Sequence, residues 1–316
     1  MANLHTHLSP LSRGESQKIE IPIHREAKLL YSYTMMPKIL VKDFHLEHTL
    51  LCGQLFRASR IEDWYYITVR DRIFSVRQSA GYLEFQGVDR EFLVYYFALD
   101  EPYPIILKQI ENDPHIRKAI KKYHGMRIVR QDPWECLISF LCSSAANIPK
   151  IKLNLEMLAQ FFGKRIELNG FEWYSFPNPG ELNHYEKIVQ AKTGFRAKYL
   201  KAANDLVTEA FLESLKKLPY PEAKKALKQI PGVGDKIADC ILLFSLGFTE
   251  AFPIDTWIKK ILQKLYFKNQ VVSNRELQDF GPKYFGRYAG YAQQFLYMLA
   301  RESTTGSRRD AKSAKF

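Results

Sequence analysis

The chain has few cysteines and no long apolar run. Only four of its 316 residues are cysteine, at positions 52, 136, 142 and 240, and their spacing shows no pairing pattern. Such a low, unpatterned count argues against a disulfide scaffold and favours a reduced compartment. No stretch approaches the roughly 18 apolar residues of a membrane span, and the first thirty residues lack the apolar segment of a secretory signal. These absences predict an intracellular protein without a membrane segment.

What the chain does contain is enough apolar residues for a core and an excess of positive charge. Hydrophobic residues make up 46% of the sequence, and 46 Lys and Arg against 34 Asp and Glu give a formal net charge of +12. The length fits about two domains of roughly 150 residues. A basic surface attracts polyanions, with nucleic acid as the first candidate and anionic lipid as the second. A role at a membrane surface is disfavoured, since no long Lys-rich amphipathic helix is present.

The patterns predict an α+β protein with four segments. Residues 1–36 are polar and irregular and are expected to form a disordered leader, and the basic stretch 303–316 is expected to be a disordered tail. The segment 37–125 is expected to form an antiparallel β-sheet domain, because β-rich runs at 63–69, 72–77 and 82–85 are separated by short turns. Helical patterns follow, so the segment 126–302 is expected to form a helical domain.

Helix boundaries in the second domain are marked by caps and by punctuating residues. Asp132 followed by Pro133 is typical of an N-cap and a first helical residue. Further helices are expected at 149–162, 198–216, 221–229, 235–247, 256–267 and 282–300.

A tight hairpin lies between two of these helices. Pro231 ends the first helix, and Gly232 and Gly234, on either side of Val233, can adopt the backbone angles of a tight turn. The amides at the start of the next helix, near Asp235, would point outward at its positive end and suit a DNA phosphate. Carbonyls of residues 232–234 are candidates for a monovalent cation. A plain helix-turn-helix corner, with glycines used for packing, is the alternative.

A lysine and an aspartate flank the same region. Lys236 and Cys240 are four residues apart and share a helical face. Lys236 could equally be solvated or paired with Asp239. Asp255 opens the following helix, and its simplest interpretation is an ordinary N-cap.

The block from Ala223 to Lys260 resembles the helix-hairpin-helix DNA glycosylases. Lys236, Cys240 and Asp255, with Asp255 nineteen residues after Lys236, look like the 8-oxoguanine DNA glycosylase branch. Segments 53–57, 131–136, 139–144, 194–199 and 288–293 are also similar to that branch and occur in the same order. The resemblance extends from about residue 40 to residue 300.

This resemblance implies a bifunctional DNA glycosylase and lyase that acts on damaged double-stranded DNA. Its members extrude the damaged base. Lys236 would attack C1′ and form a Schiff base, after which β-elimination cleaves the strand. Such an amine attacks only when neutral. Asp255 would stay ionised, stabilise positive charge on the sugar and orient the lysine. A monomer associated with DNA in cytoplasm, nucleoid or nucleus is expected, without a required cofactor. No iron–sulfur cluster is expected, because no four-cysteine run follows residue 240.

The resemblance also assigns residues around the flipped base. The Gly53 carbonyl would accept the N7 proton that distinguishes 8-oxoguanine from guanine, and Gln293 would bond the Watson–Crick edge. Tyr297 and Cys240 would contact the two faces of the base, and Trp257 stands close to them where the branch commonly has His. From the residues alone, Gly53 could be a turn glycine and Tyr297 a core aromatic.

Other residues are implied to contact DNA around the gap, where this chain departs from the pattern. The DNA-facing loop runs to Asn147, Phe195 replaces a Tyr wedge, and Arg196 matches a reader of the orphaned cytosine. Lys150 replaces an Arg and lacks its bidentate fork. Ala145 replaces an Asn, and Ala300 an Asp. These departures predict weaker discrimination for the base opposite the lesion.

Two other functions stay open at this point. A non-catalytic helix-hairpin-helix scaffold would use the hairpin for phosphate contact and would need neither Lys236 nor Asp255. A glycosylase for another damaged base is the second alternative. A monofunctional alkylation-damage glycosylase usually lacks the lysine, so Lys236 argues against it.

Overall fold

The computed structural model describes the chain from residue 36 to residue 313. The leader predicted at 1–36 therefore lies outside the described residues except for its last residue. Within residues 36–313, no helix combines the length and the apolar character needed to cross a membrane.

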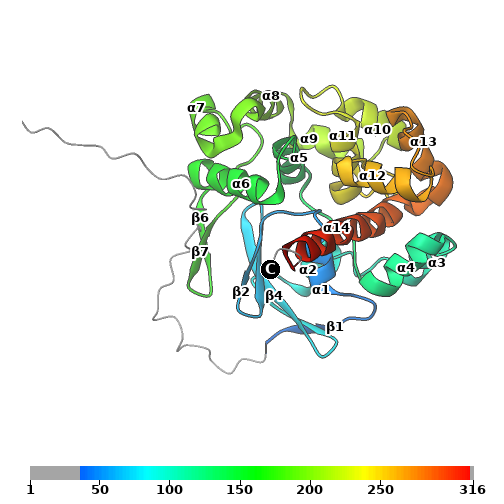
Figure 1. Ribbon diagram of the computed structural model, residues 1–316. Helices are drawn as coiled ribbons and strands as arrows, with labels where there is room; N and C mark the ends of the chain where they lie inside the picture. The colour runs from blue at the N-terminus through cyan, green and yellow to red at the C-terminus, as the bar shows by residue number, and fades with distance from the viewer. Residues whose placement is uncertain (1–35, 314–316) are drawn as a thin grey trace, which may run out of the picture.

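The first half of the chain contains a five-stranded antiparallel sheet with strand order β1-β5-β4-β3-β2 (Figure 1). Its strands are β1 Lys38–Leu40, β2 Ala58–Ile61, β3 Trp64–Val69, β4 Arg72–Ser79 and β5 Tyr82–Gln86. The three β-rich runs predicted from the sequence are β3, β4 and β5. A short turn joins β3 to β4, with Arg70 in the left-handed region at φ 54°.

Alternation along the strands gives the sheet two covered faces. Ile67, Phe74 and Leu83 face one side and pack with helix α2, Arg90–Tyr96. Tyr66 and Ile73 face the other side and contact Trp173. Trp173 belongs to a second hairpin, formed by β6 Arg165–Leu168 and β7 Phe171–Tyr174. The β6–β7 hairpin, inserted between two helices, was not predicted.

The helices are α1 Leu46–Leu51, α2, α3 Tyr103–Ile110, α4 Pro114–Tyr123, α5 Pro133–Cys142, α6 Ile148–Phe162, α7 Tyr185–Ile188, α8 Ala197–Leu206, α9 Glu209–Leu215, α10 Tyr220–Leu227, α11 Asp235–Ser245, α12 Thr256–Leu265, α13 Asn274–Phe285 and α14 Ala289–Ser313. Helices α1 and α2 pack with the sheet, and the others form the larger core. Helices α5 and α11 pack together, and residues along nearly their whole length are buried. The structure is therefore α+β, as predicted.

Two predicted helices are split by residues that end or start a helix. The stretch predicted at 198–216 forms α8 and α9, because the Thr208 hydroxyl accepts the amide of Phe211 at 3.1 Å and caps a new helix. The stretch predicted at 282–300 is divided at Gly286, whose φ of 66° ends α13.

The C-terminal helix differs from its prediction as well. Helix α14 continues to Ser313 and so enters the segment 303–316 that was predicted to be a disordered tail. Extending a helix that is already formed needs no new nucleation, which removes its most unfavourable step.

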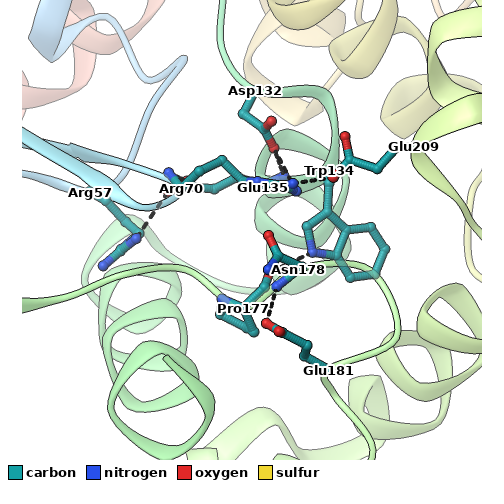
Figure 2. A network of polar contacts seen from close by, with 9 residues as sticks. All are labelled: Arg57, Arg70, Asp132, Trp134, Glu135, Pro177, Asn178, Glu181 and Glu209. Atoms are coloured by element: carbon teal, nitrogen blue, oxygen red, sulfur yellow. Dashed lines mark hydrogen bonds and ion pairs between the residues drawn. The ribbon is translucent and has the colours of Figure 1, made fainter. Parts of the chain in front are cut away.

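A network of arginines and carboxylates joins the sheet to α5 (Figure 2). Arg57, directly before β2, pairs with Glu135 at 3.3 Å, and the backbone amide of Arg70 donates to the same carboxylate at 2.9 Å. The Arg70 side chain lies 3.6 Å from Asp132, the N-cap of α5, and also pairs with Glu209. Burial raises the pKa of Asp132 to about 6. The N-terminus of α5 is thereby fixed to the sheet.

Helix α14 provides a second connection between the two parts. It packs against α12 and α4 and crosses the middle of the molecule between the helices and the sheet (Figure 1). Arg301 on α14 donates to the Leu51 carbonyl at the end of α1, at 2.8 Å. Helices α3 and α4, although they lie within 37–125, pack into the larger helical core. The domain boundary at 125/126 stays a prediction.

Candidate active site

The hairpin between α10 and α11 leaves the start of α11 open. Gly232 has φ +89°, and a Cβ at this position would lie 2.6 Å from the ring of Tyr199. The buried Val233 donates its amide to Ile230 O at 3.0 Å, which closes the turn. Gly234 is the N-cap of α11 and supplies no side-chain cap. The first amides of α11 therefore lack a capping side chain at a surface where an anion could bind.

Lys236 lies in the first turn of α11 and reaches back to the end of α5. Its Nζ donates to Ser143 Oγ at 3.1 Å and lies 4.8 Å from the centre of the Phe140 ring. Ser143 is the C-cap of α5. The lysine side chain is half-buried, so its amine is held at the surface of the helical core rather than free in solvent.

The alternative pairing of Lys236 with Asp239 is wrong. Asp239 is buried and accepts hydrogen bonds from Lys224 Nζ at 2.9 Å and from the Tyr220 hydroxyl at 2.7 Å. These contacts satisfy the carboxylate on the α10 side of α11. The Lys236 amine points elsewhere and remains available for chemistry.

Asp255 caps a helix and also interacts electrostatically with this lysine. Its Oδ1 accepts the amides of Trp257 at 2.9 Å and Ile258 at 2.8 Å at the start of α12. Burial raises the pKa of Asp255, whereas the Ile258 amide and the positive charge of Lys236 oppose this rise. The structure thus brings Lys236 and Asp255, from two different helices, within electrostatic reach of each other.

Cys240 and Tyr297 lie in the same neighbourhood. Burial raises the pKa of the Cys240 thiol to about 12, and the charge of Lys236 opposes this rise. Burial also raises the pKa of Tyr297 to about 12, with the charges of Asp255 and Cys240 adding to the effect. The residues predicted to contact the two faces of a base are therefore gathered around the lysine and the aspartate.

Gly53 meets Tyr297 from the sheet side of the molecule. Its φ is +81°, and a Cβ at this position would lie 2.7 Å from Tyr297 Oη. The next residue, Gln54, is fully buried. Its Nε2 donates to Thr49 O and Arg127 O, both at 2.8 Å, and its Oε1 accepts the Val129 amide at 2.9 Å. The turn at Gly53 is thus anchored by Gln54, and a larger residue at position 53 would strain the backbone and displace the Tyr297 ring.

Gln293 on α14 has an unmatched polar atom. The residue is 4% exposed, and its Oε1 has no hydrogen-bond partner within the part of the chain that the structure describes. A buried acceptor without a partner costs about 1–3 kcal/mol, so it calls for an explanation.

Two of the predicted DNA-gap residues are an exposed ring and a buried arginine beside it. The Phe195 side chain is 55% exposed. Arg196 lies 4.6 Å from this ring and is itself buried, with Nε donating to Ser144 O at 2.7 Å and Nη1 to Thr193 O at 3.1 Å. Arg196 therefore fixes the loop after α5 and has fewer donors left than predicted for a reader of bases.

The other two gap residues lie at the start of α6. Asn147 caps this helix, and its Oδ1 accepts the Lys150 amide at 3.0 Å. Burial lowers the pKa of Lys150, and the nearby charges of Lys192 and Arg196 lower it further. Three cations therefore cluster here.

Sequence reasoning missed the roles of Ser143, Phe140 and Lys192. Ser143 and Phe140 belong to a segment that was noted for its resemblance, but their contact with Lys236 joins residues that are far apart in the chain. Lys192 had a local signal, since a basic residue directly precedes the Thr193-Gly194 turn next to the predicted wedge.

Comparisons with known proteins identify the family of this chain. The family model described as "8-oxoguanine DNA glycosylase, N-terminal domain" matches residues 38–137. An N-glycosylase/DNA lyase of Arabidopsis thaliana is 34% identical over 203 residues, which cover 60% of this chain and 55% of that protein. The N-glycosylase/DNA lyase of Saccharomyces cerevisiae is 31% identical over 267 residues, covering 70% and 69%. The DNA-bound 8-oxoguanine glycosylase/lyase of Clostridium acetobutylicum is 34% identical, with a TM-score of 0.79 and coverage of 86% and 99%.

This chain belongs to the 8-oxoguanine DNA glycosylase family. The positions at which this glycosylase departs from the expected pattern can now be located. Trp257 lies in the first turn of α12, beside Asp255, and is partly buried against the helical core. Ala300 is buried on α14. Ala145 is exposed and has φ +50°, a conformation that asparagine tolerates better than alanine.

Proposed function

We propose that this protein excises 8-oxoguanine from duplex DNA and then cleaves the strand at the resulting abasic site. Membership of the glycosylase family supports this function. The observation that carries it is the convergence of an amine and a carboxylate, Lys236 on α11 and Asp255 on α12, next to a buried cysteine and Tyr297.

The partner is damaged double-stranded DNA. The formal net charge of +12 favours binding to a polyanion through counterion release. The open amides that begin α11 suit one phosphate of the lesion strand. A monovalent cation at the carbonyls of 232–234 would add positive charge beside that phosphate. The protein acts as a monomer and needs no cofactor in this proposal.

The first step is loss of the base. The neutral Lys236 amine forms a bond to C1′ while the bond from C1′ to the base nitrogen breaks, and the base leaves with the electron pair. Positive charge develops on the sugar during this exchange. The ionised carboxylate of Asp255 stabilises that charge, and its helix amides keep the carboxylate in place.

The second step cleaves the strand. Opening of the sugar ring converts the C1′ adduct into a protonated Schiff base with Lys236. Loss of a proton from C2′ then expels the 3′ phosphate oxygen by β-elimination. Ser143, which accepts a hydrogen bond from Lys236 Nζ, positions the amine for the first attack.

Two groups would recognise the base: the backbone carbonyl of Gly53, which lies in a constrained turn, and the side-chain oxygen of Gln293, which has no hydrogen-bond partner among the described residues. The backbone carbonyl at Gly53 would accept the N7 proton of 8-oxoguanine, whereas guanine presents a lone pair there. The unpaired Gln293 Oε1 would accept from the donors on the Watson–Crick edge. Each buried hydrogen bond made or lost is worth about 1–3 kcal/mol, so the two together discriminate usefully.

The opposite base is expected to be read weakly. Arg196 donates to two backbone carbonyls, Lys150 offers a point charge, and Ala145 has no side chain to fill the gap. We propose a smaller preference for cytosine than a bidentate arginine pair would give.

The test uses oligonucleotide duplexes that carry one 8-oxoguanine, with undamaged duplex as the control. We expect strand nicking of the damaged duplex opposite each of the four bases, with modest differences among them. Binding without nicking would identify a scaffold instead. Nicking of a duplex with another lesion, but not of the 8-oxoguanine duplex, would identify a different damaged base. Either result would overturn the proposal.

A further inference from the structure

A lysine in an unfavourable backbone conformation lies three residues before the exposed Phe195. The segment η2, Val189–Thr193, contains a kink at Lys192, whose backbone is non-helical at φ 59° and ψ 25°. This left-handed region is disfavoured for residues with a Cβ and is freely adopted by glycine. Lysine at this position therefore costs folding free energy that glycine would not.

Hydrogen bonds from buried groups hold the residues on either side of Lys192 in place. Asn154 on α6 is fully buried, and its Nδ2 donates to Ala191 O at 2.7 Å. The Thr193 hydroxyl donates to Ile188 O at 2.6 Å, and Arg196 Nη1 donates to Thr193 O at 3.1 Å. Strained residues that are held by their surroundings concentrate at functional sites.

The turn presents an ammonium group that no carboxylate neutralises. Lys192 is exposed, and neither Lys192 nor Lys150 has an ion-pair partner among residues 36–302. Their mutual repulsion contributes to the lowered pKa of Lys150. The third cation, Arg196, already donates to backbone carbonyls. Lys150 lies one turn before Asn154 on α6, and Asn154 bonds the residue that precedes Lys192, so the two unpaired ammonium groups lie near each other, next to Arg196.

We propose that Lys192 binds a DNA phosphate next to the Phe195 ring, and that Lys192 and Lys150 together form an anion site on the gap side of the protein. A lysine acts as a point charge and suits a phosphate better than the patterned edge of a base. A phosphate between the two ammonium groups would relieve their repulsion. This inference rests on the proposed function only in taking duplex DNA as the polyanion.

The strain supplies a test in which stability and binding change in opposite directions. Lys192→Gly removes both the charge and the unfavourable φ, so the melting temperature should rise while DNA binding weakens. The dissociation constant for duplex DNA is measured over a range of salt concentrations. Loss of one phosphate contact should reduce the slope of log affinity against log salt by about 0.9. Lys192→Arg should restore the parent slope.

A matched control exists in the same chain. Lys268 is exposed, has φ 48°, and follows α12, which lies at the other side of the helical layer from α7 and α8 (Figure 1). Lys268→Gly removes the same charge and the same kind of strain. It should raise the melting temperature and leave the salt slope unchanged.

Three outcomes would overturn the inference. The slope for Lys192→Gly could equal that of the parent, or both glycine variants could lower it equally, which would indicate a general charge effect. A changed preference for the opposite base in the nicking assay, at constant slope of undamaged-duplex binding, would make Lys192 a base reader. Because the binding is measured on undamaged duplex, failure of the parent to nick 8-oxoguanine DNA would count against the proposed function alone.

Discussion

Helices α11 and α12 begin close together but use their N-termini differently. Helix α11 begins at Gly234, which leaves its first amides without a side-chain cap. Helix α12 begins at Asp255, whose carboxylate accepts two of its own first amides. Both helices have a positive N-terminal end. The end of α11 is open to an anion from outside the protein, whereas the end of α12 is occupied by a carboxylate of the chain itself.

The difference separates binding from chemistry. An open end can hold a phosphate, and it exchanges that partner with the solvent. A capped end holds a carboxylate permanently in one position and opposes the rise of its pKa that burial causes. Lys236, in the first turn of the open helix, lies within electrostatic reach of the carboxylate on the capped one. Substitutions at these two helix starts should therefore affect binding and catalysis to different extents.

The largest effect is expected for Lys236→Gln. This change removes the nucleophile and leaves the start of α11 intact. Trapping with borohydride should yield no covalent adduct with 8-oxoguanine DNA. The affinity for undamaged duplex should stay within about twofold of the parent, because in the proposed function Lys236 contacts the sugar and not a phosphate. Persistence of the adduct would remove Lys236 from the proposed chemistry.

Asp255→Asn keeps a side chain that can cap α12 and removes its negative charge. Asparagine caps a helix as well as aspartate does, so α12 should remain folded, while excision should fall on the order of 10²-fold or more in single-turnover assays. An undiminished rate would reduce Asp255 to a structural cap.

The same variant predicts a pH dependence of stability. Because the pKa of Asp255 is raised in the folded protein, ionisation of this group disfavours folding as the pH rises through the folded pKa. Asp255→Asn should therefore be more stable than the parent at neutral pH. The difference should vanish below the ordinary aspartate pKa of 3.8, as measured by denaturant unfolding at a series of pH values.

Gly234→Asp would give α11 the cap that α12 has. A Cβ at Gly234 meets no atom within 4 Å and its backbone is extended, so the side chain fits. The fold should gain a few tenths of a kcal/mol, but the added carboxylate should weaken duplex binding roughly tenfold, equivalent to about 1.4 kcal/mol. Gly234→Asn is the neutral control. Equal affinity of the Asp variant and the parent would show that no phosphate binds there.

The smallest effect is expected for Ser143→Ala, which removes the hydrogen bond to the Lys236 amine. The loss of about 1 kcal/mol corresponds to a roughly fivefold slower adduct formation. Ser144→Ala is the matched control, because its backbone carbonyl, and not its hydroxyl, accepts the Arg196 bonds. Equal rates for the two variants would leave Ser143 without a positioning role.

Local chemistry made much of the fold and of the hairpin predictable. The runs around Arg70 were predicted as strands because alternation and a short turn are visible in a few residues. Asn169-Gly170 between β6 and β7 offered the same kind of signal, with φ of 55° and 74°, but it lies inside a stretch dominated by helices. The division of α8 from α9 depended on one threonine cap in an otherwise helical run.

The site itself was predictable only through motifs and not through geometry. Ser143 and Lys236 form a hydrogen bond although they are 93 residues apart in the chain. Gly53 and Tyr297 approach each other although one lies near the start of the described chain and the other near its end. No periodicity encodes such contacts, because they arise from packing of α5 on α11 and of α14 across the sheet. The local signal at Lys192 showed a turn but not its hydrogen bonding, because Asn154, which bonds the preceding residue, lies on another helix.

The contact of Gly53 with Tyr297 has a consequence for dividing the protein. One partner belongs to the segment predicted at 37–125 and the other to the segment at 126–302, so neither fragment contains all the groups that surround the base. Separately expressed fragments should each be inactive. When the two fragments are mixed, strand nicking should return, and its rate should depend on the product of the two fragment concentrations. The nicking assay would then measure how well the fragments reassemble.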